Sequence, residues 1–424
     1  MPLPPRLLVA DQVAGGIRVL DLPGGSTVGV VEGRHLAEHA GFLALPGGRS
    51  AFVDDLAGEL VVLDPYGPEA GRPLVETTAP VATPAEHLAT DASGRLVAVT
   101  TGLGRNEEPW SDLLTLVDLR PDLTSPTPGG ARSVRPRSVR VRTRVGEPGV
   151  TLLGDADPLV VLRHREPGTL SAYAAGTLLA GAPACPPAAP DHELPLPDHD
   201  GHGDALDPYS GRLFAAAGSG VHRARREDGP AGARLVAEEP LSWAGQGRGY
   251  YLRLDPARRA LWSCVRGGPA DPGRWPEWTN DAWFHDLTTG RTGRVPLGPG
   301  LVFRLAVAAA HVAYARVHPD GDELVLLDPS HTPLPRVTAR LPLPPMDGAP
   351  LPGGTPWDGV QRRAVAASPG AAYTAVSRGG HGEVHLFEGM RPLTTLKVPT
   401  PLDDGGHLAL VAPGDGAQAD RIGR

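Results

Sequence analysis

The sequence predicts an all-β fold in which one small sheet is repeated around a ring, and three observations predict it. Short apolar runs alternate with polar turns along the 424 residues, and no stretch keeps a helical period. The counts of Gly 55 and Pro 48 are high, as expected for many short strands joined by turns. One unit, residues 86–120, recurs in imperfect copies.

The unit at 86–120 contains three apolar runs. The first run meets a polar turn at Asp91–Arg95, the second follows this turn, and the third ends near Asp118. Comparable turns recur at Pro46–Arg49, Gly154–Pro158, Asp207–Arg212, Asp255–Arg259, Ala308–Ala310, Ser368–Gly370 and Pro413–Gly416. Their spacing of roughly 45 to 65 residues is typical of a four-stranded blade with its loops.

Third runs that end in Asp also recur, at residues 17–22, 60–65, 114–119, 283–290 and 324–329. In this rhythm the chain resembles β-propellers of the YVTN and quinoprotein amine dehydrogenase heavy-chain type. The resemblance covers nearly the whole chain and implies a single closed β-propeller. It transfers no functional residue, because only the rhythm of the blades matches. The Trp-Asp signature of WD40 blades is missing from the third runs, since the pair Trp357-Asp358 lies in a Pro/Gly-rich loop.

The two ends of the chain complete one blade. Residues 5–31 predict three strands, and residues 407–412 predict the innermost strand that these three lack. A blade shared by both ends closes the ring and protects its edges. With this blade the count favours eight blades; seven is the alternative, because the unit at 149–184 is weak. The propeller is expected to span 1–416, and 417–424 to form a flexible C-terminal tail.

Bulk properties exclude several classes of function. A net charge of −8 and a pI of 6.0 argue against a nucleic-acid or membrane binder. Cys185 and Cys264 lie too far apart in sequence for a CxxC metal pattern or a disulfide framework. The sequence shows no signal peptide and no apolar run of membrane-spanning length, so a cytoplasmic location is expected. Lys397 is the only lysine, so arginine supplies almost all of the positive charge. This usage indicates a bacterial-type genomic base composition.

Four long connections are expected to gather on one face of the ring. In a blade with strands a to d from the axis outward, the b–c loops and the d–a links share a face. Segments 102–112 and 266–281 are predicted to be b–c loops, and 185–201 and 344–360 to be d–a links. Long loops on a rigid scaffold commonly carry function, so this face at the mouth of the channel is the expected working face.

Residues 191–207 contain the sharpest local motif. Asp198, Asp200 and His202 nearly follow the D-x-D-x-D-G pattern of calcium loops, and the segment resembles the FG-GAP type of propeller loop. His202 replaces an oxygen ligand and Leu206 stands where a carboxylate is expected, so a transition metal is as plausible as calcium. The alternative interpretation is an ordinary polar loop.

Histidine recurs near the start of the predicted innermost strands, at His39, His87, His202 and His407. Innermost strands converge on the axis, so these imidazoles could form a metal centre. A slip of one residue turns a side chain to the other face, and the alternative is a set of rim histidines.

Aromatic and acidic residues complete the predicted site. Trp110, Trp275, Trp278, Trp283 and Trp357 are expected on the loop-rich face, where they could stack on a ligand or hold their own loops in place. Glu107, Glu108 and Asp204 are candidate acids or bases. The arginine-rich segment 132–144 alternates with valine and predicts an outermost strand with one solvated face.

These patterns leave two functions open. The first is a binding or scaffolding propeller that holds a protein or small-molecule ligand on its loop-rich face. The second is a metal-dependent lyase, hydrolase or oxidoreductase with a His-rich site at the channel mouth.

Overall fold

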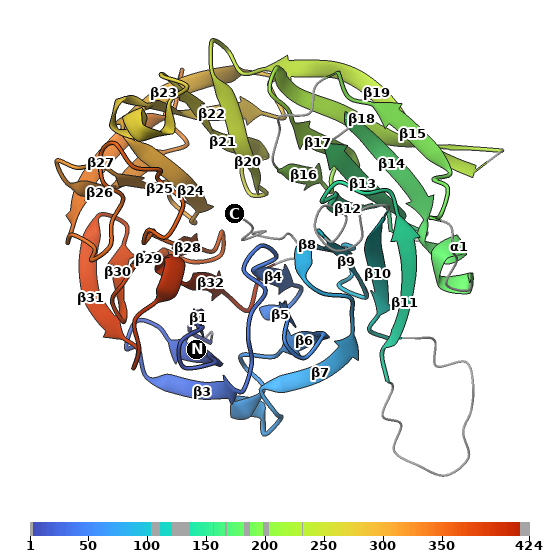
Figure 1. Ribbon diagram of the computed structural model, residues 1–424, viewed down its shortest axis with the longest axis horizontal. Coiled ribbons are helices and arrows are strands. Elements are labelled where there is room, and N and C mark those ends of the chain that lie inside the picture. Colours follow the sequence, from blue (N-terminus) through green and yellow to red (C-terminus); the bar gives the residue numbers. More distant parts are fainter. Residues whose placement is uncertain are drawn as a thin grey trace.

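The structure is an all-β propeller with eight four-stranded antiparallel sheets around a central channel (Figure 1). This computed structural model describes residues 3–102, 111–120, 135–155, 157–165, 168–181, 187–197, 203–230 and 232–415. The prediction of eight blades is therefore confirmed over seven. The predicted tail at 417–424 lies outside the described residues, as does Cys185.

From the channel outward, the strands of the first four sheets are β32 (His407–Val411), β1 (Arg6–Asp11), β2 (Gly16–Asp21) and β3 (Thr27–Glu32); β4 (Phe42–Leu45), β5 (Arg49–Asp54), β6 (Glu59–Leu63) and β7 (Val75–Pro80); β8 (Ala85–Thr90), β9 (Leu96–Thr101), β10 (Asp112–Asp118) and β11 (Arg137–Thr143); and β12 (Gly149–Leu153), β13 (Leu159–Arg165), β14 (Gly168–Ala174) and β15 (His192–Pro195).

The strands of the other four sheets are β16 (Asp204–Asp207), β17 (Arg212–Ala216), β18 (Gly220–Gly229) and β19 (Gly232–Ser242); β20 (Arg248–Asp255), β21 (Ala260–Gly267), β22 (Thr279–Asp286) and β23 (Thr292–Pro299); β24 (Leu301–Val307), β25 (Val312–Val317), β26 (Asp322–Asp328) and β27 (Arg336–Leu343); and β28 (Val365–Ala367), β29 (Tyr373–Arg378), β30 (Glu383–Glu388) and β31 (Arg391–Lys397).

Helices are few and short among the described residues. They are α1 (Ala175–Ala180) and 3-10 turns at Pro68–Ala70, Pro272–Glu277 and Asp403–Gly405. In the described part of the chain, no helix is long and apolar enough to span a membrane.

The ring closes as the sequence predicts. Strand β32 pairs with β1, so that Val411 lies opposite Arg6 and His407 opposite Ala10. The hydroxyl of Tyr66, from the neighbouring blade, donates to the Val411 carbonyl at 3.2 Å. The last strand is thereby tied to two blades, and its edge is covered.

Apolar side chains fill the spaces between neighbouring blades. The second strands of the blades are buried on both faces; every residue of β9 and of β25 is buried. This double burial explains why these strands read as continuous apolar runs rather than alternating ones. The outermost strand β11 alternates instead, with Val139 and Val141 buried and Arg140 exposed, as predicted for segment 132–144.

Aspartates at the ends of the third strands stabilise the turns that follow. The Asp118 carboxylate accepts from the Arg120 backbone N–H at 3.0 Å, and Asp328 accepts from the Ser330 N–H at 2.9 Å. Short polar side chains satisfy turn N–H groups in this way. The predicted third strands are confirmed as β2, β6, β10, β22 and β26.

One predicted connection is wrong. Segment 185–201 was expected to link two blades, but it contains β15, which pairs with β14 as the outermost strand of its own blade. Strand β15 has only four residues, alternates between half-buried and exposed, and ends in Pro195, so it lacks the apolar run that marked the other strands. The link at 344–360 and the b–c loops at 102–112 and 266–281 lie between the strands that the sequence indicated.

Candidate functional site

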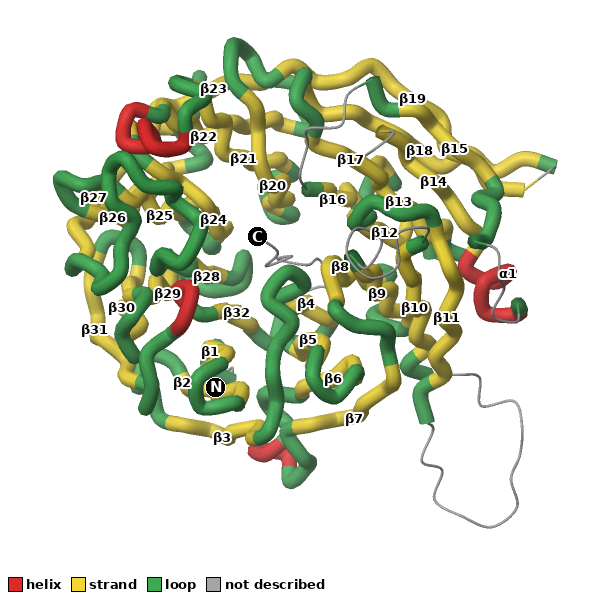
Figure 2. The backbone as a smooth tube through the Cα atoms, in the orientation of Figure 1, coloured by secondary structure: helices red, strands yellow, loops and turns green. Residues whose placement is uncertain are grey.

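A cavity opens at each mouth of the central channel. The larger one, about 980 Å³, is lined from the b–c loop after β21 and from the link that carries Trp357, and it is named the mouth cavity here. The smaller one, about 470 Å³, lies among the short a–b turns, such as Pro208 and Pro256. Figure 2 shows the connections, in green, that surround the channel. The larger cavity is on the face to which the long loops were assigned.

Three innermost strands carry a β-bulge near their first residues, at the mouth cavity. The register shifts between Ala85 and His87 in β8, between Tyr250 and Arg253 in β20, and between Val302 and Arg304 in β24. A bulge breaks the alternation of a strand and re-aims its side chains. Adjacent residues therefore line the cavity together, among them Glu86 with His87.

Tyr251 is the residue that the β20 bulge alters most. Its φ is +57°, a left-handed value that costs a non-glycine residue roughly 1–2 kcal/mol. Leu252 beside it stays in the core, 1% exposed, while Tyr250, Tyr251 and Arg253 all line the cavity. The backbone just before β16 approaches closely: a Cβ on Gly203 would lie 2.8 Å from the Tyr251 Cα.

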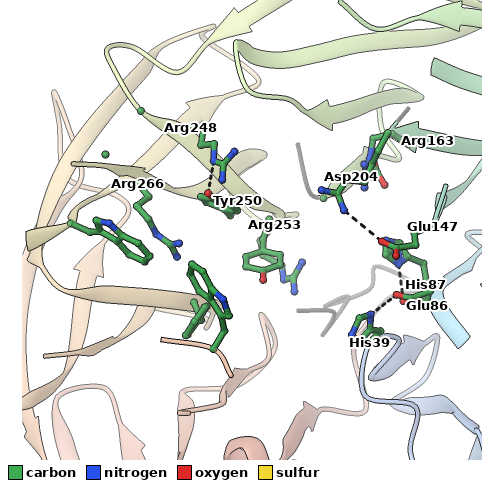
Figure 3. A pocket seen from close by; sticks show the side chains of 18 of the residues that line it. His39, Glu86, His87, Glu147, Arg163, Asp204, Arg248, Tyr250, Arg253 and Arg266 are labelled. Atoms are coloured by element: carbon green, nitrogen blue, oxygen red, sulfur yellow. Dashed lines mark hydrogen bonds and ion pairs between the residues drawn. The ribbon is translucent and has the colours of Figure 1, made fainter. Parts of the chain in front are cut away.

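An arginine–aromatic cluster, defined as Trp357, Trp278, Arg266, Tyr250 and Arg248, forms one wall of the mouth cavity. Figure 3 labels Arg266, Tyr250 and Arg248, which lie on the side of the cavity away from Glu147 and His87. The rings of Trp357 and Trp278 stack with centroids 5.8 Å apart. The Arg266 guanidinium lies 4.6 Å from the Trp278 ring and 4.7 Å from the Tyr250 ring. Arg248 lies 5.1 Å from the Tyr250 ring and donates to its hydroxyl. Cation–π contacts of this kind hold a guanidinium in place without neutralising it.

Arg266 has no acidic partner in the part of the chain that the structure describes. Its guanidinium also lies 5.8 Å from the Phe303 ring, and its Nε is buried without a hydrogen bond. A fixed guanidinium whose charge no carboxylate balances is preorganised for an anion.

The opposite wall is ion-paired. His39 Nδ1 lies 2.5 Å from a Glu86 carboxylate oxygen, and Arg163 donates to Asp204 at 2.7 Å. Glu147 lies 3.6 Å from Arg165. Every carboxylate of this wall has a basic neighbour, so the positive charge of the cavity is concentrated on the side of the arginine–aromatic cluster.

The predicted histidines are only partly brought together. His39 and His87 line the mouth cavity, while His407 is 4% exposed at the start of β32 and does not line it. Asp198, Asp200 and His202 lie outside the described residues. Within the described ranges, no group of three or more His, Cys, Asp or Glu side chains is placed to hold a metal ion. The metal centre that included His202 stays a prediction.

Some of the predicted acids and tryptophans line the mouth cavity, and others lie outside the described residues. Asp204 lines the mouth cavity, whereas Glu107, Glu108 and Trp110 lie outside the described residues. Trp278 and Trp357 also line the cavity.

Trp275 and Trp283 are fully buried, at 0% exposure each, and are not on the cavity surface. Their indole N–H groups donate to the carbonyls of Leu351 and Ser242, respectively. These two rings hold loops and blades together, so the predicted ligand-stacking role does not fit them in this structure.

Arg266, Tyr251 and Arg253 are cavity residues that the sequence patterns did not single out. The segment Gly247–Asp255 does carry a signal, because Arg and Tyr occupy an innermost strand, whereas the innermost strands β4, β28 and β32 hold mainly Leu, Ala or Val. Polar residues on a strand that faces the axis indicate a wet, functional stretch.

Comparisons with known proteins support the fold. No protein-family model matches the chain, and no curated protein matches its sequence. Among solved structures, the chain is similar to apo AztD from Citrobacter koseri, with a TM-score of 0.61, 12% identity, and coverage of 97% of this chain and 99% of that one.

It is also similar to the dihydro-heme d1 dehydrogenase NirN in complex with DHE, with a TM-score of 0.56, 17% identity, and coverage of 96% and 75%. The predicted propeller is thus confirmed at the level of the fold. The finer resemblance to YVTN-type proteins stays a prediction.

Proposed function

We propose that this protein is a binding propeller that holds a small aromatic carboxylate in the mouth cavity. The observation that carries the proposal is Arg266, which is held against the rings of Trp278 and Tyr250 and lacks an acidic partner among the described residues. A guanidinium binds a carboxylate through two parallel hydrogen bonds, and this pairing is strongest where water is displaced.

The rings around Arg266 favour an aromatic rather than an aliphatic ligand. Trp357, Tyr250 and Phe303 line the mouth cavity and are half-buried, while Trp278 lines it at only 5% exposure. Aromatic faces gain extra contact energy from a second ring, of about 0.5–1.5 kcal/mol beyond burial. The cavity volume of about 980 Å³ is at the upper end of the range of small-molecule sites.

The experiment is ligand-observed saturation-transfer NMR with benzoate as the probe, on the full chain and on Arg266→Gln. Loss of the guanidinium removes the charged partner of the carboxylate, so we expect the apparent Kd of benzoate to rise at least tenfold. Cyclohexanecarboxylate tests the aromatic preference, and is expected to bind more weakly than benzoate.

Arg291→Gln is the matched control. The Arg291 guanidinium lies 5.7 Å from the Phe284 ring, a similar cation–π contact, but it does not line the mouth cavity. This variant is expected to bind benzoate as the parent chain does. Equal loss in both variants, or no saturable binding of benzoate to the parent at millimolar concentration, overturns the proposal.

A further inference from the structure

The hydroxyl of Tyr251 is a polar group that has no hydrogen-bond partner among the described residues. No hydrogen bond joins it to any residue that the structure describes, although the side chain lines the mouth cavity. Its neighbour Tyr250 differs, because its hydroxyl accepts a hydrogen bond from Arg248. A free donor on a cavity wall is available to a ligand.

The backbone holds this hydroxyl in place at a cost. Tyr251 keeps a left-handed φ of +57° on a bulge, in contact with a Gly203 that itself has a φ of +113°. Strained residues of this kind gather at ligand-binding positions, where the surrounding structure over-determines them. Nothing in the core requires the strain, since Leu252 rather than Tyr251 fills the space between the blades.

The charged groups that act most strongly on the Tyr251 phenol are arginines. Burial raises the pKa of its phenol, while Arg304, Arg266, Arg253 and Arg362 act in the opposite direction. The net shift is upward, so the phenol keeps its proton at neutral pH and can donate it in a hydrogen bond. The nearby arginines make a negatively charged acceptor the favoured one.

Tyr251 also stands at the junction of two cavities. With Phe303 and Trp357 it lines both the mouth cavity and a side cavity of about 300 Å³. The side cavity is further lined by Arg304, Arg362, Arg363, Asp358 and Asp404. Arg363 is already bonded to Asp322 at 2.7 Å, and Asp358 accepts from Thr355 at 3.1 Å. A ligand that fills the mouth cavity therefore meets Tyr251 at the entrance of a second polar space.

We propose that Tyr251 marks a second anion subsite, so that the ligand is an aromatic dicarboxylate with one carboxylate on Arg266 and the other on the Tyr251 hydroxyl. This inference rests on the proposed function, because it assumes that an aromatic carboxylate occupies the mouth cavity. It adds the number of acidic groups on the ligand and assigns a residue to the second one.

The experiment compares benzoate with phthalate, isophthalate and terephthalate by isothermal titration calorimetry. The three isomers place the second carboxylate at three distances from the first. At least one isomer is expected to bind roughly tenfold or more tightly than benzoate, since a hydrogen bond to a charged group contributes on that scale. In Tyr251→Phe this advantage is expected to disappear, so that the Kd of the favoured isomer becomes about equal to the Kd of benzoate measured on the same variant.

Tyr209→Phe is the control, because Tyr209 lines the cavity at the opposite mouth and is 69% exposed. It is expected to leave all four affinities unchanged. If benzoate binds through Arg266 but no isomer binds more tightly, the second subsite is refuted and the proposed function stands. An isomer advantage that survives in Tyr251→Phe refutes the role of the hydroxyl. If none of the four compounds binds the parent chain, both proposals fail.

Discussion

The two ends of the innermost strands are built differently. At the end with the short turns, buried aspartates satisfy the chain: Asp255 accepts from the Arg258 N–H at 3.1 Å, and Asp91 accepts from the Leu96 N–H at 2.8 Å. At the end with the long loops, three strands bulge, Tyr251 is strained and Arg266 lacks an acid among the described residues. The comparison teaches that one end of the same hairpins maintains the fold while the other is free to bind.

The largest expected effect is a loss of stability on substitution of Asp255, at the end of the strands with the short turns. Asp255 is fully buried and also accepts from the Arg258 guanidinium at 2.8 Å. Asp255→Ala leaves these donors without their acceptor, so we expect the free energy of unfolding to fall by about 2–3 kcal/mol. Urea denaturation measures the loss, and benzoate binding by NMR is expected to be unchanged at low denaturant. Weaker benzoate binding in the folded variant would contradict the separation of the two ends.

A glycine pair compares the ends within one hairpin. Gly203 and Gly211 flank β16 and both have positive φ, but a Cβ at Gly203 meets the Tyr251 backbone, whereas a Cβ at Gly211 has nothing within 4 Å. Both alanine variants pay the left-handed strain, and only Gly203→Ala adds a backbone clash. We expect Gly203→Ala to be less stable than Gly211→Ala by about 2 kcal/mol. Equal thermal denaturation midpoints would show that the bulge does not depend on Gly203.

The pH dependence of stability tests a buried histidine near the loop-rich end of the blades. His164, near the loop-rich end of β13, is 1% exposed and its ring nitrogens lack hydrogen-bond partners in the described structure. Burial, with Arg144 and Arg163 nearby, lowers the pKa of His164 to about 3. Because the unfolded chain binds this proton near pH 6.5 and the folded chain does not, stability falls as the pH drops from 6.5 towards 3. The expected slope for this residue is about 1 kcal/mol per pH unit.

The variant His164→Met tests that slope. It replaces the imidazole with an apolar side chain of similar size that does not titrate, so its stability is expected to depend less on pH between 4 and 6.5 than that of the parent. His285 and His311, whose pKa values burial lowers to about 4, remain in both proteins and set the residual slope. An unchanged slope would mean that His164 is protonated in the folded state.

Sequence patterns predicted the blades because turns and third strands repeat with a chemical cause. Asp118 and Asp328 satisfy turn N–H groups, so selection of a short acidic side chain marks the strand end. Strand β15 was not predicted, because its four residues are half-buried or exposed, end in proline and contain no apolar run. Helix α1 was not predicted, because its six residues are too few to show a helical period.

The candidate site was predicted only in part, for a geometric reason. Trp278 and Trp357 could be assigned to the loop-rich face, because long loops are recognised in a sequence by their length and composition. Tyr251 and Arg253 depend on a bulge, and one extra residue in a strand leaves no trace in apolar periodicity. Arg266 is held by three rings that come from three other segments of the chain. A pattern along the sequence does not show which distant residues meet in space, so it could not single out this arginine.

The composition of the arginine–aromatic cluster has a consequence for how this protein can change over evolutionary time. Trp278 and Trp357 belong to connections that lie outside the eight sheets, while Arg266 and Tyr250 are anchored in paired strands. Trp357 is only partly buried, so substitutions in its connection can alter which ring is accepted with little effect on the packing between blades, whereas Trp278 is 5% exposed and packs in a core cluster with Leu301 and Val317. The connection that carries Trp357 thus separates heritable variation in ligand choice from variation in stability, and new specificities can arise in a lineage by drift in this one loop beside a fixed guanidinium.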